Sequence, residues 1–146
     1  MEFETIELAW GNIPFSASLP ANINSAWVDT LSAVGTLLKL SPGESIIEQD
    51  EENVDQGFLV LSGSFSVEKD GAPPLLKEGP ELLGEMSRFN PEHKRTAHVQ
   101  TTSEVAVITF SWENAFSGLA DLLSDEEIQL LNHAFEQYAW EHFTDV

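Results

Sequence analysis

The stretch that decides the fold is Gly84–Ala97, which reads GEMSRFNPEHKRTA. Three of the chain's six Lys and Arg residues lie in it, at Arg88, Lys94 and Arg95, whereas the whole chain has a formal net charge of −19. A local group of positive charges in a strongly acidic chain indicates a site for a small anion, because the overall field repels anions from the rest of the surface.

The composition excludes several classes of protein. A chain of 146 residues with 42% hydrophobic residues suits one globular domain. It has no cysteine, so it can form no disulfide, zinc–thiolate site or cysteine nucleophile. The acidic start Met1–Glu4 lacks the features of a signal peptide, and no apolar run is long enough to span a bilayer. We expect a soluble, cytoplasmic protein that binds neither nucleic acid nor membranes, since both are anionic.

The region around this stretch, residues 35–110, has the pattern of a β-structure. Short segments of apolar and β-branched residues alternate with Gly, Pro and acidic turns. Six or more short strands at regular spacing are typical of a sandwich or barrel. The strands expected are Thr36–Leu40, Ser45–Glu48, Phe58–Leu61, Ser64–Val67, Thr96–Thr101 and Val105–Phe110.

The N-terminal residues predict an extension followed by a helix. In the extension, residues 1–18, the alternation of Ile6, Leu8 and Trp10 favours a short strand with one buried face. The next region, residues 19–34, is expected to be helical. Apolar side chains recur every three or four positions over residues 21–34, and Asn24 or Ser25 could cap the helix.

The C-terminal residues 111–146 predict two helices. A shorter helix is expected over Trp112–Leu123. The pattern Ser124–Glu127 is a capping box, in which the first and last side chains bond each other's backbone N–H groups. It is followed by an apolar stripe made of Ile128, Leu131, Phe135, then Tyr138 or Ala139, and Phe143. We therefore expect residues 1–146 to form one domain that is mostly β with flanking helices.

This layout resembles the cyclic nucleotide-binding domain family, which regulates transcription activators, kinases and ion channels. The phosphate-binding cassette of that family reads Gly-Glu, a short helix and loop, then Arg-Ser/Thr-Ala. Here it is Gly84–Glu85, nine further residues, then Arg95–Ala97. Two upstream segments, Pro42–Gln49 and Phe58–Gly63, also fit the family's pattern. The resemblance, which runs from about Leu19 to Leu123, implies a double-stranded β-helix (jelly-roll) barrel with an N-terminal helix and C-terminal helices.

The resemblance also implies a role for each cassette residue. Arg95 would bind the cyclic phosphate through its guanidinium, together with backbone N–H groups near Thr96 and Ala97. Glu85 would accept a hydrogen bond from the ribose 2′-hydroxyl, because an ionised carboxylate is only an acceptor. Gly84 would permit a backbone conformation and close approach that a side chain prevents. Met86 follows within the same binding segment.

Each of these residues also has a purely structural interpretation. Arg95 could be a surface arginine paired with Glu92 or Glu85, and Glu85 could cap a helix. Thr96 could be an ordinary strand residue, or its hydroxyl could favour cGMP. The aromatic residues Phe135 and Tyr138 could cover a bound base as a lid, or could belong to the core or to a dimer interface.

Two segments depart from the family's pattern. Asp50–Glu51 stand where the family commonly has a glycine turn, and Gly79–Pro80 reverse the usual Pro-Gly order before the cassette. Neither departure removes a residue expected to bind the ligand, but divergent members of the family sometimes keep the fold without the nucleotide.

The sequence predicts a stand-alone sensor that binds cAMP or cGMP and acts through an unknown protein partner or through oligomerisation. A homodimer through the C-terminal helix is one such arrangement. The alternative is an interaction module that binds no nucleotide. We expect no enzyme, cofactor or metal, because the four histidines form no metal-ligand pattern and no catalytic motif is present: His93, His98, His133 and His142.

Overall fold

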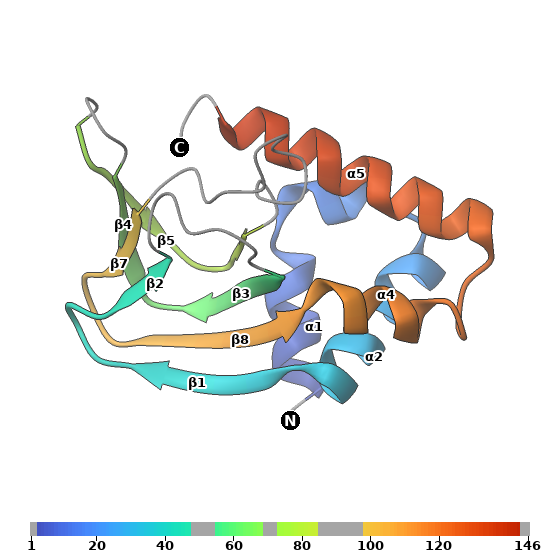
Figure 1. The fold of residues 1–146 in the computed structure, drawn as a ribbon, viewed down its shortest axis with the longest axis horizontal. Coiled ribbons are helices and arrows are strands. Elements are labelled where there is room, and N and C mark those ends of the chain that lie inside the picture. The colour runs from blue at the N-terminus through green and yellow to red at the C-terminus, as the bar shows by residue number, and fades with distance from the viewer. Residues whose placement is uncertain (1–2, 48–54, 69–72, 85–97, 144–146) are drawn as a thin grey trace.

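The computed structural model describes residues 3–47, 55–68, 73–84 and 98–143 (Figure 1). The chain begins with α1 (Phe3–Gly11), a 3-10 helix η1 (Pro14–Ser18) and α2 (Ala21–Val34). Strands β1 (Thr36–Leu40), β2 (Ser45–Ile47), β3 (Gln56–Ser62), β4 (Ser64–Glu68), β5 (Leu75–Glu78), β6 (Glu81–Leu83), β7 (His98–Thr101) and β8 (Val105–Ser111) follow. Helices α4 (Trp112–Leu119) and α5 (Asp125–Phe143) end the described chain.

The strands form two antiparallel sheets of four strands each. The first sheet has the order β1-β8-β3-β6, and the second has the order β2-β7-β4-β5. Successive strands mostly alternate between the sheets, as in a roll. We call these two sheets the β-roll. The predicted mostly-β fold with helices at both ends is confirmed, and the six predicted strands are all present.

Two strands, β5 and β6, were not predicted. Both are short, and Pro73–Pro74 and Gly79–Pro80 lie beside them. Such residues usually indicate turns, and so the pattern of these short strands was not recognised.

The central strands β3 and β8 separate two hydrophobic cores. Because successive side chains of a strand point to opposite faces, Leu59 and Ile108 contribute to a core shared with the helices, while Val60 and Val107 contribute to the inside of the roll. The roll core is largely aliphatic and consists of Ile47, Phe58, Val60, Phe65, Val67, Leu83, Val99, Val105 and Val107.

The helices pack together on one side of the first sheet and form the helical layer, at the right of Figure 1. We use this name for α1, η1, α2, α4 and α5. Its core is aromatic. The ring of Trp27 lies 5.0 Å from Phe135 and 6.0 Å from Trp112, between ring centroids. Trp10 also contacts both Trp27 and Phe135. These large rings fill the space between the helices and the sheet.

The predicted strand in residues 1–18 is wrong, because Phe3–Gly11 is the helix α1. Ile6 and Trp10 are buried, but Leu8 between them is 70% exposed. The burial therefore follows a spacing of four residues and not of two, as expected for a helix packed on one face. Trp10 Nε1 donates a hydrogen bond of 2.9 Å to Asn24 Oδ1, which joins α1 to α2.

The predicted helix over residues 21–34 is confirmed, but its predicted cap is wrong. Pro20 occupies the N-cap position, with no capping side chain. Asn24 instead accepts from Trp10 and donates to the backbone oxygen of Ser16 at 2.8 Å. Its side chain thus links three helical segments rather than ending one.

The C-terminal helices agree with the prediction in most respects. Helix α4 ends at Leu119, four residues before the predicted end, and a turn leads from it to α5. The predicted capping box is present: Ser124 N donates to Glu127 Oε1 at 3.0 Å, and Glu127 N donates to Ser124 Oγ at 3.2 Å. Of the predicted stripe, Leu131, Phe135 and Tyr138 are buried.

Candidate functional site

The candidate site begins at Gly84, where β6 ends. Its backbone has φ of 89°, in the region that glycine adopts readily and L side chains rarely do. Gly84 thus adopts a backbone conformation that a side chain would disfavour, and its role at the ligand stays a prediction. Chain segment 85–97 lies outside the described residues, and the described chain resumes with β7 at His98.

The two ends of the segment are attached to different sheets. Strand β6 belongs to the first sheet and β7 to the second. Leu83, just before Gly84, and Val99, just after His98, are both buried in the roll core. Any ligand held by the intervening segment would thus be held by a chain whose ends are fixed to both sheets of the roll.

Strand β6 also contacts the core of the helical layer. Leu82 is fully buried among the residues of that core, while its neighbour Leu83 faces the roll core. Leu82 pairs with Leu59 and Leu83 pairs with Phe58 of β3. The strand that leads into the cassette is therefore in contact with both cores.

The junction of β8 with α4 lies at the same end of the first sheet as Gly84. Phe58 of β3 is paired both with Leu83 and with Thr109 of β8. Near this end, Asp55 Oδ2 accepts a hydrogen bond of 2.6 Å from Ser111 Oγ, and Asp55 O accepts one of 2.9 Å from Trp112 N. Ser111 Oγ in turn accepts from Asn114 N and caps α4.

The structure places three of the eight predicted site residues. They are Gly84, at the end of β6, and Phe135 and Tyr138, both buried in the helical layer. Glu85, Met86, Arg95, Thr96 and Ala97 lie outside the described residues. Phe135 contacts several aromatic rings of the core, so packing accounts for its position; a lid role for Phe135 or Tyr138 stays a prediction. The predicted homodimer through the C-terminal helix also stays a prediction. The buried residues of α5, which are Leu131, Phe135 and Tyr138, pack within their own chain.

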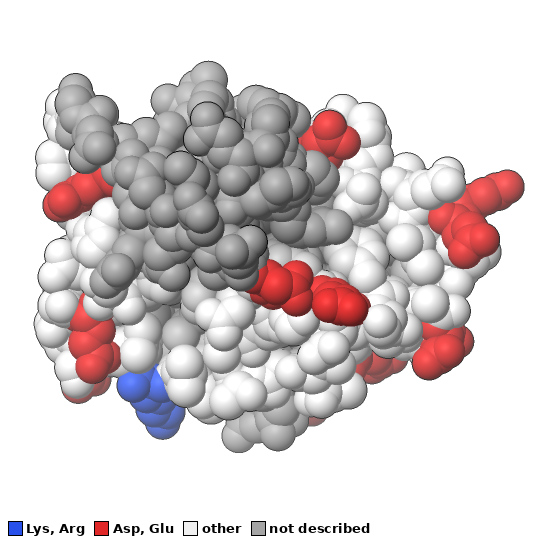
Figure 2. Space-filling view, viewed as in Figure 1, with Lys and Arg blue, Asp and Glu red and all other residues white. Residues whose placement is uncertain are grey.

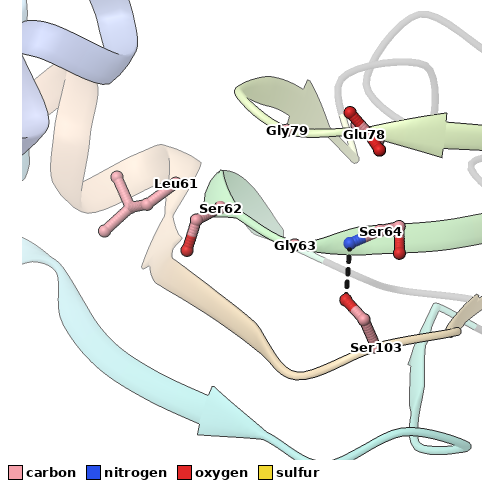
Figure 3. A pocket seen from close by; sticks show the side chains of 7 residues that line it. All are labelled: Leu61, Ser62, Gly63, Ser64, Glu78, Gly79 and Ser103. Carbon is pink, nitrogen blue, oxygen red and sulfur yellow. Dashed lines mark hydrogen bonds between the residues drawn. The ribbon is translucent and has the colours of Figure 1, made fainter.

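A pocket of about 310 Å³ lies at the other end of the β3–β6 pair (Figure 3). It is lined by Leu61, Ser62, Gly63, Ser64, Glu78, Gly79 and Ser103. Its polar groups largely bond one another, since Ser64 N donates to Ser103 Oγ at 2.9 Å and Gly79 N donates to Gly63 O at 2.9 Å. Glu78 supplies the only charged side chain in its lining. A carboxylate repels phosphate, so this pocket does not suit a cyclic nucleotide.

The glycine of the reversed Gly79–Pro80 pair has a structural reason that the sequence did not reveal. A Cβ atom at Gly79 would lie 2.8 Å from Val60 Cγ1 and 3.3 Å from Val60 O. The turn before β6 thus needs a residue without a side chain to lie against β3. The only sequence signal was the glycine itself, because its neighbour Val60 lies far away in the chain.

Charge is distributed unevenly along the chain. All six Lys and Arg lie between residues 39 and 95, and none lies in residues 1–38 or 96–146. Among the described residues, the Lys and Arg side chains are those of Lys39 and Lys77. Figure 2 shows acidic side chains spread over the visible face, with one basic patch near its lower left edge. Three of the six Lys and Arg residues, Arg88, Lys94 and Arg95, belong to the cassette.

The described residues contain neither a cluster of metal ligands nor a membrane-spanning helix. No three His, Asp or Glu side chains in the described ranges come together as ligands for a metal ion. Within the same ranges, no helix combines the length and the apolar character that crossing a bilayer requires.

Comparison with known proteins gives a consistent result. A family model described as the cyclic nucleotide-binding domain matches residues 37–121. The Pycsar effector protein RsmPycTIR of Rhodovulum sp. (strain MB263) is 33% identical over 75 residues, which is 50% of this chain and 29% of that protein. The chain therefore matches less than a third of that relative's length.

Two solved structures have a similar fold at low sequence identity. The sensor domain of the transcriptional regulator DNR from Pseudomonas aeruginosa aligns with a TM-score of 0.61 at 16% identity, covering 81% of this chain and 84% of that one. The structure described as Sp-2Cl-cAMPS bound to PKAR CBD2 aligns with a TM-score of 0.66 at 15% identity, covering 97% and 91%. At such identities the likeness concerns the fold.

Proposed function

This chain belongs to the cyclic nucleotide-binding domain family, and we propose that it is a sensor that binds a 3′,5′-cyclic nucleotide at the cassette and passes the signal to a partner protein. The family is one of regulatory, ligand-binding domains. The observation that carries the proposal is the family match over residues 37–121, which includes the whole cassette and Gly84 with its positive φ.

Arg95 is the residue that we assign to the phosphate. A guanidinium forms paired hydrogen bonds with phosphate oxygens and is more weakly hydrated than an ammonium group. Glu85, next to Gly84, is assigned to the ribose 2′-hydroxyl. Arg88 and Lys94 would add positive potential, which matters in a chain of net charge −19. The nucleotide is cAMP or cGMP in this proposal, with Thr96 as the residue that could favour guanine.

The signal has a continuous route through the described residues. A change at Gly84 acts on β6, where Leu83 is packed in the roll and Leu82 in the helical layer. The same end of the sheet contains Asp55 and Ser111, which bind the start of α4. Ligand binding would shift the population of helix arrangements to the extent that it favours one of them.

The surface that would meet the partner is the helical layer. Its described elements contain no Lys or Arg, and their exposed carboxylates include Glu113, Asp125, Glu126 and Glu136. Complementary charge increases association rates and selects partners. We propose that the partner presents a basic surface. RsmPycTIR is described as an effector protein, which supports a role for this chain in controlling an effector.

The test is a thermal shift with cAMP, cGMP, cCMP and cUMP, each added in excess over the protein. A ligand at about 100 times its dissociation constant stabilises the folded state by about 2.7 kcal/mol. For a domain of this size the melting temperature would rise by about 5–11 °C. No shift with any of the four nucleotides would refute the nucleotide sensor.

A matched pair of variants tests the assigned anchor. Arg95→Ala and Lys94→Ala remove one positive charge each from adjacent positions. We expect Arg95→Ala to weaken binding by about 100-fold or more, since hydrogen bonds to a charged group are lost, and Lys94→Ala to change it only a fewfold. Calorimetric titration measures both. Equal effects of the two variants would assign the binding to general charge and not to Arg95.

The second candidate function is an interaction module without nucleotide. The acidic surface of the helical layer, which contains no Lys or Arg, favours this function, because that surface could bind a basic partner without a ligand in the roll. If no nucleotide shifts the melting curve, while a basic protein binds the helical layer, this second function replaces the first.

A further inference from the structure

Among the described strands, β1 and β5 are the two without a buried residue, and of these two β1 is the one without an acidic side chain. Four of its five residues are exposed, and the fifth, Leu40, is half-buried. Two of the exposed side chains are large and apolar: Leu37 is 45% exposed and Leu38 is 42% exposed. Since neighbouring side chains of a strand point to opposite faces, β1 is apolar and accessible on both faces.

The outer edge of β1 is also free of any described strand. β1 is the terminal strand of the first sheet and pairs with β8 over Thr36↔Thr109 to Leu40↔Val105. In Figure 1 it forms the lower edge of the roll. In an edge strand, alternate residues direct their N–H and C=O groups outward, where they can pair with a further strand.

The charge near β1 selects the kind of strand that fits this edge. The segment Thr30–Gly43 contains no Asp or Glu, and its single charged residue is Lys39. In Figure 2 the lower margin of the molecule, where Figure 1 shows β1, is mostly uncharged, with one basic patch. A basic partner would be drawn to the acidic faces, whereas repulsion between this chain and another acidic molecule is smallest at this acid-free edge.

We propose that β1 is a self-association surface, at which β1 pairs antiparallel with β1 of a second copy around a two-fold axis. Two copies of this chain repel each other through most of their surface, and the repulsion is smallest where both present an acid-free strand. Pairing centred on Leu38 places the two Leu38 side chains opposite each other and each Lys39 opposite Leu37 of the other copy. The first sheets of two chains become one continuous sheet.

The proposed contact is small, so the dimer is weak. A five-residue strand buries less than the roughly 1,200 Å² found in stable interfaces, and weak, concentration-dependent association is expected. This inference goes beyond the proposed function, because it needs neither a bound nucleotide nor the cassette.

The experiment is sedimentation equilibrium of the full chain, without nucleotide, from micromolar to near-millimolar concentration. Two variants with the same change of charge are compared: Leu38→Glu on β1, and Leu76→Glu on β5, the edge strand of the second sheet, where Leu76 is 78% exposed. We expect the wild-type chain to dimerise, Leu38→Glu to weaken dimerisation by at least about tenfold, and Leu76→Glu to change it by less than about twofold. A wild-type chain that stays monomeric throughout, or equal effects of the two variants, would overturn the proposal.

A second measurement keeps the test independent of any loss of folding in Leu38→Glu. The chain has no cysteine, so Leu38→Cys and Leu76→Cys each introduce a single thiol. Directly opposite residues in an antiparallel pair have Cβ atoms about 4.5–5.5 Å apart, near enough for a disulfide after a small adjustment. Under mild oxidation we expect a covalent dimer from Leu38→Cys and little from Leu76→Cys. The reverse order, or the same yield from both, contradicts the pairing.

Discussion

The helical layer and the β-roll meet at one sheet but are built in different ways. The helical layer is filled by large aromatic rings such as Trp27 and Phe135, and its elements contain no Lys or Arg. The roll is filled mainly by valine, and all six basic residues lie in its strands or in the segments between them. The positive charge of the chain is thus separated from the acidic helical layer.

The two regions share three strands of the first sheet. Strands β3, β6 and β8 each contribute residues to both cores. A displacement of one of these strands changes the packing on both of its faces, since protein interiors are close-packed and have few voids to absorb it. The comparison predicts that the two regions differ in chemistry but unfold together.

The largest effect is expected from Trp27→Ala in the helical layer. Trp27 is fully buried and contacts Trp10, Phe110, Trp112 and Phe135. Removing its ring should cost about 3–5 kcal/mol of the free energy of unfolding, because a large cavity remains. Urea unfolding followed by circular dichroism measures the loss, with Trp27→Phe as the milder control.

The same experiment tests whether the two regions unfold together. Because they share three strands, we expect the far-ultraviolet and tryptophan signals of Trp27→Phe to change in one transition. Two of the three tryptophans left in this variant, Trp10 and Trp112, lie in the core of the helical layer, and the third, Trp140, belongs to α5 of the same layer. If their fluorescence changed at a lower urea concentration than the backbone signal, the two regions would be independent, and the route proposed through β6 would lose its basis.

A smaller but selective effect is expected at glycines of the roll. Gly43 and Gly63 lie in turns that lead from the first sheet to the second, with φ of 88° and 101°. A Cβ atom at Gly63 would lie 2.3 Å from Glu104 O, whereas one at Gly43 would meet nothing within 4 Å. Gly43→Ala should cost about 1 kcal/mol for its backbone conformation, and Gly63→Ala about 3 kcal/mol, because the clash is added.

The matched glycines separate backbone strain from crowding. Thermal or urea unfolding of both variants gives the two losses directly. Equal losses would mean that the loop between β7 and β8, which contains Glu104, moves away at no cost. The stability of the roll would then not depend on the close approach of Gly63 to Glu104.

The sequence predicted the parts of the fold that depend on local patterns. The helix over residues 21–34, the capping box Ser124–Glu127 and six strands follow from periodicity, capping residues and turn residues. Gly84 was identified from a motif and has the backbone that the motif implies. Arg95 and Glu85 rest on the same motif, and their assigned contacts stay predictions.

The parts that were wrong or missing depend on contacts between distant residues. Ile6, Leu8 and Trp10 alternate like a strand, but docking against α2 selects the helical spacing of Ile6 and Trp10. The role of Asn24 is fixed by Trp10 and Ser16, which no capping rule includes. The need for glycine at position 79 arises from Val60 on another strand. In each case tertiary packing overrides a local signal.

The smallest effect is expected at the contact between α2 and α5. Asn22 Nδ2 donates a hydrogen bond to Glu127 Oε2, while Glu127 Oε1 accepts from Ser124. The backbone N–H of Ser124, then the side chains of Asn22 and Ser124, hold the pKa of Glu127 below its usual value of 4.5. The charged form is therefore favoured in the folded state.

The sign of the pH dependence follows from that lowered pKa. The unfolded chain takes up the proton on Glu127 first as pH falls, so the contribution of Glu127 to stability is complete above pH 4.5 and is lost as pH falls through the lower folded pKa. We expect Glu127→Ala to lower the urea midpoint slightly near neutral pH, and the difference from wild type to disappear well below that range. Glu126→Ala, an exposed neighbour in the same first turn, is the control for helix-dipole effects. If both variants showed the same pH dependence, the contact with Asn22 would contribute nothing, and α5 would be joined to α2 by the aromatic core alone.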